Sequence, residues 1–258
     1  MSVDALSTGY QIAASRWDRR ALLRYTTVPL VLAVAVVALY AWVSSLSLDS
    51  IETRVLTGAA VRGAVVQHVV LAVTATALVV LIAVPLGILL TRRWAKPLVP
   101  VVLALANIGQ AMPALGMLVL LALLFGIGFK IALVALVATA ALPVLRNTMI
   151  GIQQVDAALV EAARGMGMRP FGILKTVELP LAVPVMLAGL RTTIVIAVGV
   201  ATVATFVNAG GLGDIIVAGI KLQRTPVLVT GGVLTAVIAL ALDWLGGLAE
   251  QLLRPRGI

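Results

Sequence analysis

The chain has 258 residues, of which 62% are hydrophobic and only 11% charged, and its mean hydropathy is +1.15. Soluble domains carry roughly 45–50% apolar and about 25% charged residues, so this composition excludes a soluble domain and indicates an integral membrane protein. The net charge of +9 then reflects loop orientation rather than nucleic-acid binding, and the absence of cysteine excludes disulfides and thiolate metal sites.

The N-terminal residues 1–25 are a mixed, Arg-containing segment that does not resemble a cleavable signal peptide. We expect this segment to be cytoplasmic, with a transmembrane domain over 26–250 and a cytoplasmic tail over 251–258. A helix needs about 20 apolar residues to cross a ~30 Å hydrocarbon core. The runs that meet this length are 27–46, 66–90, 98–125, 130–147, 181–207 and 227–248. They predict an all-α, polytopic fold with about six transmembrane helices.

The Lys and Arg residues are divided unequally between alternate loops. Thirteen of the 19 lie on the side that carries both termini and the loop 148–180, and five lie on the other side. The remaining one, Arg191, falls inside the fifth run. Because Lys and Arg collect in cytoplasmic loops, we expect a multi-pass protein with both termini and the 148–180 loop in the cytoplasm.

Two of the apolar runs are interrupted. At membrane depth the third run contains Asn107, Gln110 and Pro113, and Thr202, Thr205 and Asn208 lie at the end of the fifth. Polar groups and a helix break at this depth either line a solute path or serve helix packing, and both interpretations stay open. After the fifth run, a glycine-rich stretch leads into a short apolar piece, which predicts a re-entrant or interfacial segment on the outer side.

Two side chains inside the apolar runs, those of His68 and Arg191, each have more than one interpretation. The sole histidine, His68, serves either gating or ordinary packing with its hydrogen bonds satisfied. Arg191 either contacts solute, extends to the cytoplasmic face, or pairs with Glu178 or Asp243.

The least membrane-like stretch is the polar island from Glu161 to Pro180. Apolar residues recur at helical spacing just before and within it, at Val155, Leu159, Ala162 and Met166. Gly165 and Gly167 weaken this helix, Pro170 opens a second short one, and Pro180 separates that helix from the fifth span. On pattern alone, the island is either an amphipathic connector or a surface that another protein approaches closely at Ala162 and Ala163.

The spacing within the island resembles a known pattern. Its matching residues are Glu161, Ala162, Ala163, Gly167, Val177, Leu179 and Pro180. They are similar to the loop motif E-A-A-x3-G-x9-I-x-L-P of permease subunits of ABC importers, with Val177 in place of Ile. The stretch from Val177 to Gly213 resembles the osmoprotectant branch of that family, except that Val207 and Asn208 replace Ile-Gly. The resemblance covers roughly residues 60–250.

This resemblance implies the type I (MetI-like) permease fold in a bacterial inner membrane. It also implies partners: two copies of an ATP-binding subunit, a second permease that is an identical copy or a related paralogue, and an extracytoplasmic solute-binding protein. ATP and Mg would bind the ATPase, with no cofactor on this chain. Glu161, Ala162, Ala163, Gly165, Gly167, Leu179 and Pro180 would form the loop that couples to the ATPase.

The implied solute is glycine betaine, carnitine, choline or a similar quaternary ammonium compound, with an amino-acid importer such as a methionine permease as the alternative. Aromatic residues make up only 4% of the chain, too few for an aromatic cage at mid-membrane, so solute choice rests mainly with the binding protein. An intramembrane enzyme is disfavoured because no arrangement of catalytic residues appears. A channel or stand-alone carrier is disfavoured because no inverted repeat is evident.

Overall fold

The computed structural model describes residues 19–253, and the regular structure in that part of the chain is helical. Five helices are long and apolar enough to cross a membrane, or six if one bent pair is counted as a span. The five are α2 (Arg19–Ser44), α4 (Gly58–Leu90), α7 (Phe129–Gln153), the helix Pro170–Ala201 and α12 (Thr225–Leu253). Residues 1–18 and 254–258, which include most of the predicted terminal segments, lie outside the described residues.

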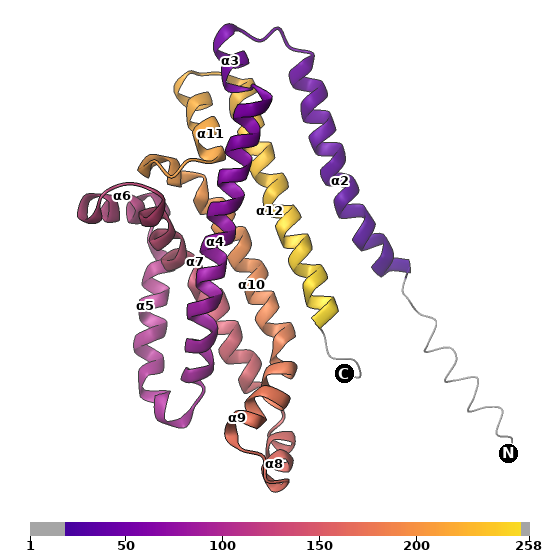
Figure 1. The fold of residues 1–258 in the computed structure, drawn as a ribbon, viewed down its shortest axis with the longest axis vertical. Helices are drawn as coiled ribbons and strands as arrows, with labels where there is room; N and C mark the ends of the chain where they lie inside the picture. The colour runs from indigo at the N-terminus through magenta and orange to yellow at the C-terminus, as the bar shows by residue number, and fades with distance from the viewer. Residues whose placement is uncertain (1–18, 254–258) are drawn as a thin grey trace, which may run out of the picture.

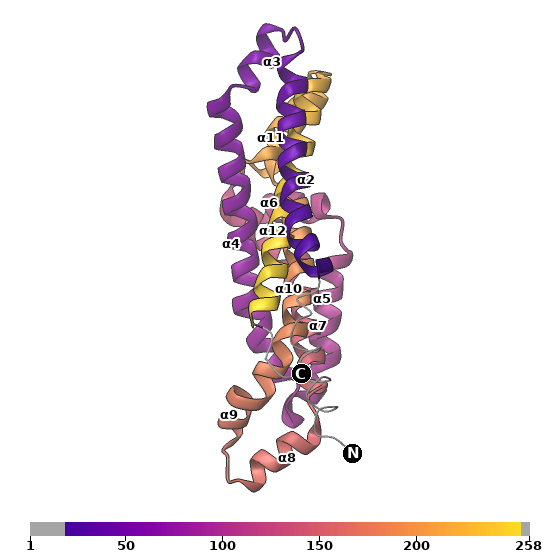
Figure 2. The ribbon, with the colours of Figure 1, turned by 90° about the vertical axis from the view of Figure 1, so that its right-hand side faces the viewer.

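The helices form an elongated bundle with short helices at both ends (Figures 1 and 2). One end carries α3 (Ser50–Val55) and α11 (Leu212–Lys221), and the other carries α8 (Ala157–Gly165) and α9 (Pro170–Ile173). We call these the α11 end and the α8 end. The first residues of α2 and the last of α12 both point toward the α8 end (Figure 1).

The core is built around α7, which contacts α4 and α10 (Leu179–Ala201) along its length. Its inward positions include Ala132, Ala135 and Ala140, all fully buried. Small residues let helix backbones approach closely where lipid supplies no hydrophobic drive between helices. At Gly189 of α10 a side chain would meet the carbonyl of Pro143 at 2.7 Å, so glycine is required at this contact.

The predicted third span is two helices that meet at a sharp angle. A 3₁₀ segment, η1 (Arg93–Leu98), leads into α5 (Val99–Ala111), and α6 (Ala114–Phe125) then turns away by 101°. Met112 and Pro113 between them are extended, with ψ of 136° and 125°. The residue before a proline is pushed out of the helical region, which explains the break at this position. Residues 98–125 therefore do not form one straight crossing.

The prediction that Pro180 separates a short helix from the fifth span is wrong, because the helix runs unbroken from Pro170 to Ala201. Proline lacks an N–H, and its ring crowds the carbonyl four residues earlier in an α-helix. Just before Pro180 the backbone adopts a π-helical winding, η2 (Leu174–Glu178), and the Leu179 N–H donates to the Leu174 carbonyl five residues back. The wider winding accommodates the proline without ending the helix.

The other helix ends differ from the sequence prediction by up to eight residues, the largest difference being the earlier starts of α2 and α4. The fourth span reaches Gln153, and α10 gives way after Ala201 to a 3₁₀ segment, η3 (Val203–Val207). The ten residues of α11 extend about 15 Å, too short to cross a bilayer. This agrees with the short outer segment expected after the glycine-rich stretch.

Candidate functional site

Helix α8 has a defined beginning and end. The Asp156 carboxylate accepts a hydrogen bond from the Ala158 N–H at 2.9 Å and caps the N-terminus. At the other end Gly167 adopts φ +80°, and the N–H groups of Gly167 and Met168 donate to the carbonyls of Arg164 and Ala163. This pair of bonds is the Schellman motif, which needs a left-handed residue at Gly167. The chain therefore turns back sharply after α8.

The two faces of α8 differ in accessibility. Ala163 is 1% exposed, on the side where α8 contacts α9 and η2. Leu159 and Met166 flank this buried side, about 40° and 60° around the helix from Ala163, and are 50% and 76% exposed. Glu161 and Ala162 are also exposed, and Glu161 makes no hydrogen bond or ion pair with any described residue. The two alanines therefore differ in environment: Ala162 is exposed, whereas Ala163 is buried where α8 packs against α9 and η2.

The loop is tied to the bundle by an ion pair that the sequence reasoning did not anticipate. Arg92, just after α4, donates from Nη1 to the Glu178 Oε1 at 3.1 Å and from Nη2 to Oε2. The Glu178 side chain is only 11% exposed. A planar guanidinium matches both oxygens of a carboxylate, so this contact fixes orientation as well as distance. Leu179 and Pro180, predicted as coupling residues, follow directly and lie half-buried at the start of α10.

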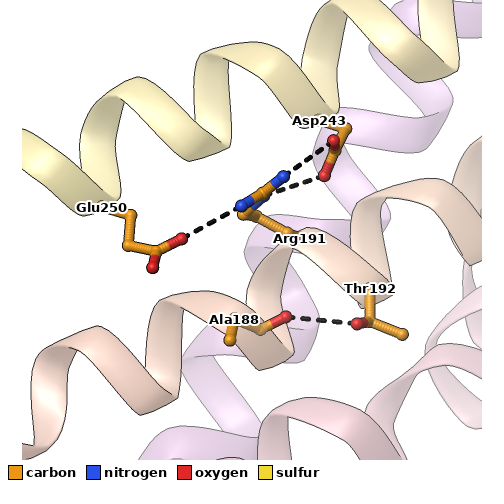
Figure 3. Close-up of polar contacts among 5 residues, drawn as sticks. All are labelled: Ala188, Arg191, Thr192, Asp243 and Glu250. Carbon is orange, nitrogen blue, oxygen red and sulfur yellow. Dashed lines mark hydrogen bonds and ion pairs between the residues drawn. The ribbon is translucent and has the colours of Figure 1, made fainter. Parts of the chain in front are cut away.

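A second ionic cluster joins α10 to α12. Arg191 donates from Nε and Nη2 to the Asp243 carboxylate, each at 2.9 Å, and from Nη1 to Glu250 Oε2 at 3.1 Å (Figure 3). The predicted partner Asp243 is confirmed. The predicted partner Glu178 is wrong, because Glu178 bonds to Arg92. All three members of the cluster are about 30% exposed, so the charges are partly desolvated.

The predicted path residues fall into two groups. Asn107 donates to the Leu103 carbonyl at 2.7 Å and accepts from Arg146 of α7 at 3.0 Å, so it joins α5 to α7. Gln110 is exposed on the last turn of α5, next to the bend at Pro113. The other group recurs every three residues: Thr202 bonds within its own helix, Thr205 donates to Asp214, and Asn208 is exposed.

The bend and η3 meet in the core. Met117 and Leu118 of α6 pack with Ala204 and Val207 of η3, in a cluster that Met112 also joins. The backbone around Pro113 and around Thr205 is therefore adjacent, while the Asn107 side chain is engaged with α7 instead. Among residues 19–253 no group of three His, Asp or Glu side chains is placed to hold a metal.

His68 is fully buried on α4. Its Nε2 donates to the Val198 carbonyl of α10 at 3.2 Å, whereas Nδ1 has no hydrogen-bond partner. The glycine-rich stretch lies against it, because a side chain at Gly211 would approach His68 Nδ1 to 3.1 Å. His68 therefore joins α4 to α10 and supports the glycine-rich stretch, with one of its two nitrogens bonded.

The sequence reasoning also missed two polar residues at the α11 end. Gln67 Oε1 accepts from the Gly211 N–H at 3.1 Å, and Asp214 lies beside it on the first turn of α11. Both line a cavity of about 460 Å³ together with Phe129, Asn208 and Gly210. The available signal was a carboxylate placed directly after a run of glycines.

An all-α bundle of five or six apolar helices with a loop of this form defines a polytopic membrane transport component. Residues 83–255, more than half of the chain, match the family model described as "Binding-protein-dependent transport system inner membrane component". The chain belongs to this family. It is therefore a permease subunit of an ABC importer in the inner membrane, a transport component rather than an enzyme, and it works with an ATPase and a binding protein.

Curated relatives and solved structures agree with this assignment. The chain is 42% identical to a carnitine transport permease protein of Listeria monocytogenes over 73% of this chain and 84% of that protein. It is 40% identical to a choline transport system permease protein of Bacillus subtilis, over 74% and 88% respectively. In an inward-facing structure of the MetNI methionine ABC transporter, one chain superposes with a TM-score of 0.66 at 26% identity, covering 75% of this chain and 95% of that one. The expected family and fold are confirmed.

Proposed function

We propose that this chain forms the membrane path of an ATP-driven importer for a quaternary ammonium osmoprotectant, such as glycine betaine, carnitine or choline. The observation that carries the proposal is the coupling loop: the exposed side chains of Leu159, Glu161, Ala162 and Met166 on a helix capped at both ends. Relatives that share this chain's sequence at 36–42% identity are named for carnitine, choline and glycine betaine transport. The methionine alternative rests on a more distant likeness, at 26% identity.

The coupling role follows from the chemistry of the exposed α8 face. Leu159 and Met166 are large apolar side chains that a lone subunit leaves in water, and Ala162 between them permits close approach of a partner backbone. Glu161 is a free carboxylate on the same helix, able to accept hydrogen bonds from a partner. ATP, bound with Mg on two copies of the separate ATPase, closes the ATPase dimer and moves the docked helices. The permeases then alternate between inward-open and outward-open states.

The path itself lies between this chain and a second permease, an identical copy or a paralogue. Gln110, Pro113, Thr202, Thr205 and Asn208 contribute to it, and Asn107 supports it through Arg146. An extracytoplasmic binding protein delivers solute at the α11 end, while α8 and both termini lie in the cytoplasm. The directions of α2 and α12 in Figure 1 support this orientation, as does the excess of Lys and Arg at the α8 end.

The test is charge reversal at Glu161 in the complete importer, reconstituted in vesicles with its ATPase and binding protein. Glu161→Lys should lower radiolabelled glycine betaine uptake at least tenfold and reduce ATPase co-purification, without changing the thermal denaturation of the permease. Arg93→Glu, a charge reversal at the same end on another loop, is the matched control and should retain uptake. Normal uptake and normal assembly in the Glu161 variant would refute the coupling role.

A further inference from the structure

The cavity at the α11 end differs from the rest of the apolar bundle in the groups that line it. It has a volume of about 460 Å³ and lies between α4, the first residue of α7, and the stretch from Asn208 to Asp214. Its apolar wall is formed by Val66 and Val70 of α4 and by the ring of Phe129. Its polar groups are the side chains of Gln67, Asn208 and Asp214.

The backbone that presents these groups is held in a defined shape. Asn208 is left-handed, with φ 58° and ψ 39°, and Gly210 has φ +76°. The stretch is pinned to α4 by the hydrogen bond from the Gly211 N–H to Gln67 Oε1. A side chain at Gly210 would come within 2.5 Å of that same oxygen, so only glycine allows the contact. Asp214, three residues further on, is therefore placed by a loop with little freedom.

The charge on Asp214 is not neutralised within the described part of the chain. Its carboxylate accepts a hydrogen bond from the Thr205 hydroxyl, and no Lys or Arg among the described residues forms an ion pair with it. This includes Lys130, which follows Phe129 in the sequence. The two other acids at this end are engaged: Asp49 pairs with Arg224 at 2.7 Å, and Glu52 is buried in a capping box with Asp49.

A carboxylate that has no ion-pair partner among the described residues, beside an aromatic ring and two valines, suits one class of ligand. A quaternary ammonium ion carries a full positive charge, cannot donate hydrogen bonds, and exposes only methyl groups to its surroundings. It is attracted by an aromatic ring face and by a nearby negative charge. An anion would be repelled by Asp214, and a neutral sugar would gain nothing from the charge. A single ring, in place of a full cage, keeps the site weak, which a transport path requires for release.

We propose that Asp214 and Phe129 form a weak, transient binding site for the trimethylammonium group at the α11 end of the solute path. This inference rests on the proposed function and assigns one step of it to named residues. Gln67 and the glycines of the 208–211 stretch act as positioning residues, because they place the Asp214 carboxylate without supplying the charge.

The test compares choline with 3,3-dimethylbutan-1-ol, which has the same shape but a carbon in place of the charged nitrogen. Binding of each probe to the purified permease–ATPase complex, without binding protein, is measured by saturation-transfer NMR. The wild-type complex should bind choline about two- to fivefold more tightly than the neutral isostere, the range expected for an exposed charge and one ring. Asp214→Asn should abolish this preference. Phe129→Leu should reduce it, and Phe129→Tyr should retain it.

The matched control is Asp49→Asn, which removes a carboxylate at the same end, keeps an N-cap residue and should leave the preference unchanged. Because each variant is judged by the ratio of two probes, partial loss of folded protein does not affect the result. The proposed binding site is refuted if the wild-type complex shows no preference for choline over the neutral isostere, or if that preference persists in Asp214→Asn. Glycine betaine uptake by the complete wild-type importer is measured separately, and its absence would count against the proposed function instead.

Discussion

Arg191 of α10 and Asp243 of α12 form a two-point ion pair, with both nitrogen–oxygen distances at 2.9 Å (Figure 3). The stem of Arg191 lies directly on α12, because a side chain at Gly246 would come within 2.8 Å of its Cγ. Two glycines, Gly246 and Gly247, leave room for the arginine along the helix surface. The pair therefore fixes both the spacing and the rotation of α10 against α12.

Arg191→Ala should lower the free energy of unfolding by about 1.5–3 kcal/mol, the range for hydrogen bonds to charged groups, because Asp243 and Glu250 are left partly desolvated without a cation. The free energy of unfolding of Arg191→Lys should lie between those of the wild type and Arg191→Ala, because an ammonium keeps the charge but cannot match both carboxylate oxygens. The measurement is the thermal denaturation of the detergent-purified complex. Thr192→Ala is the control, because that hydroxyl bonds only to Ala188 within its own helix. Equal stability of Arg191→Ala and Thr192→Ala would contradict this account.

Gly167→Ala should weaken coupling, while Gly165→Ala should not. Both glycines have open space where a Cβ would lie, so the difference is conformational: Gly167 has φ +80°, and Gly165 is in the last turn of α8. A left-handed alanine costs about 1–2 kcal/mol, whereas alanine in a helix gains roughly 0.5–1 kcal/mol over glycine. Uptake per ATP hydrolysed in vesicles should fall for Gly167→Ala only. Identical behaviour of the two variants would show that the turn after α8 does not need this geometry.

Glu178→Gln and Arg92→Gln should each reduce the number of solute molecules moved per ATP, by loosening η2 from the end of α4. The neighbouring exposed Arg93, which has no ion-pair partner among the described residues, gives the control variant Arg93→Gln. The exchanged pair, Arg92→Glu with Glu178→Arg, should recover part of the loss. If Arg92→Gln and Arg93→Gln move the same number of solute molecules per ATP, the ion pair does not contribute to coupling between ATP hydrolysis and transport.

Gly109→Ala should destabilise the contact between α5 and α7. A Cβ at this position would lie 2.5 Å from the Ala138 carbonyl oxygen, so one backbone must move. Overpacking of this kind costs about 1–3 kcal/mol. At Gly116→Ala the nearest atom is Pro113 Cβ at 3.8 Å, which makes it the control, with stability unchanged or slightly higher. Denaturation midpoints of the two variants in detergent should differ by several degrees, and their coincidence would argue against close contact at Gly109.

The sequence was sufficient to place the apolar spans and the break near Pro113, because lipid imposes length and hydrophobicity on every crossing. It also offered Asp243 as one of several alternatives for Arg191, and the structure shows that this pair forms. It did not give the 101° angle of the break, since a proline marks a break without fixing where the next helix points. Pro180 misled for a related reason: the π-helical winding of η2 that absorbs the proline depends on backbone hydrogen bonding, which no residue pattern specifies.

The sequence also did not predict the directions in which several side chains point. Ala162 and Ala163 are adjacent in the pattern, yet a rotation of about 100° between them places one outward and one inward. Glu178 was one of the alternative partners for Arg191, but it bonds to Arg92, which is 86 residues away in the sequence. Asp214 was overlooked because its significance depends on Phe129 and Gln67, which only the folded chain brings beside it.

The unbroken helix from Pro170 to Ala201 has a mechanical consequence. Its 32 residues extend about 48 Å, with the first turns against α8 and the far end next to η3 at Thr202. A rod of this length works as a lever: tilting it by about 5° at one end displaces the other by about 4 Å. The break predicted at Pro180 would have placed a hinge within this helix, and a tilt at one end would then not be transmitted to the other end. Because the proline is accommodated in η2, the helix is continuous from α9 to η3.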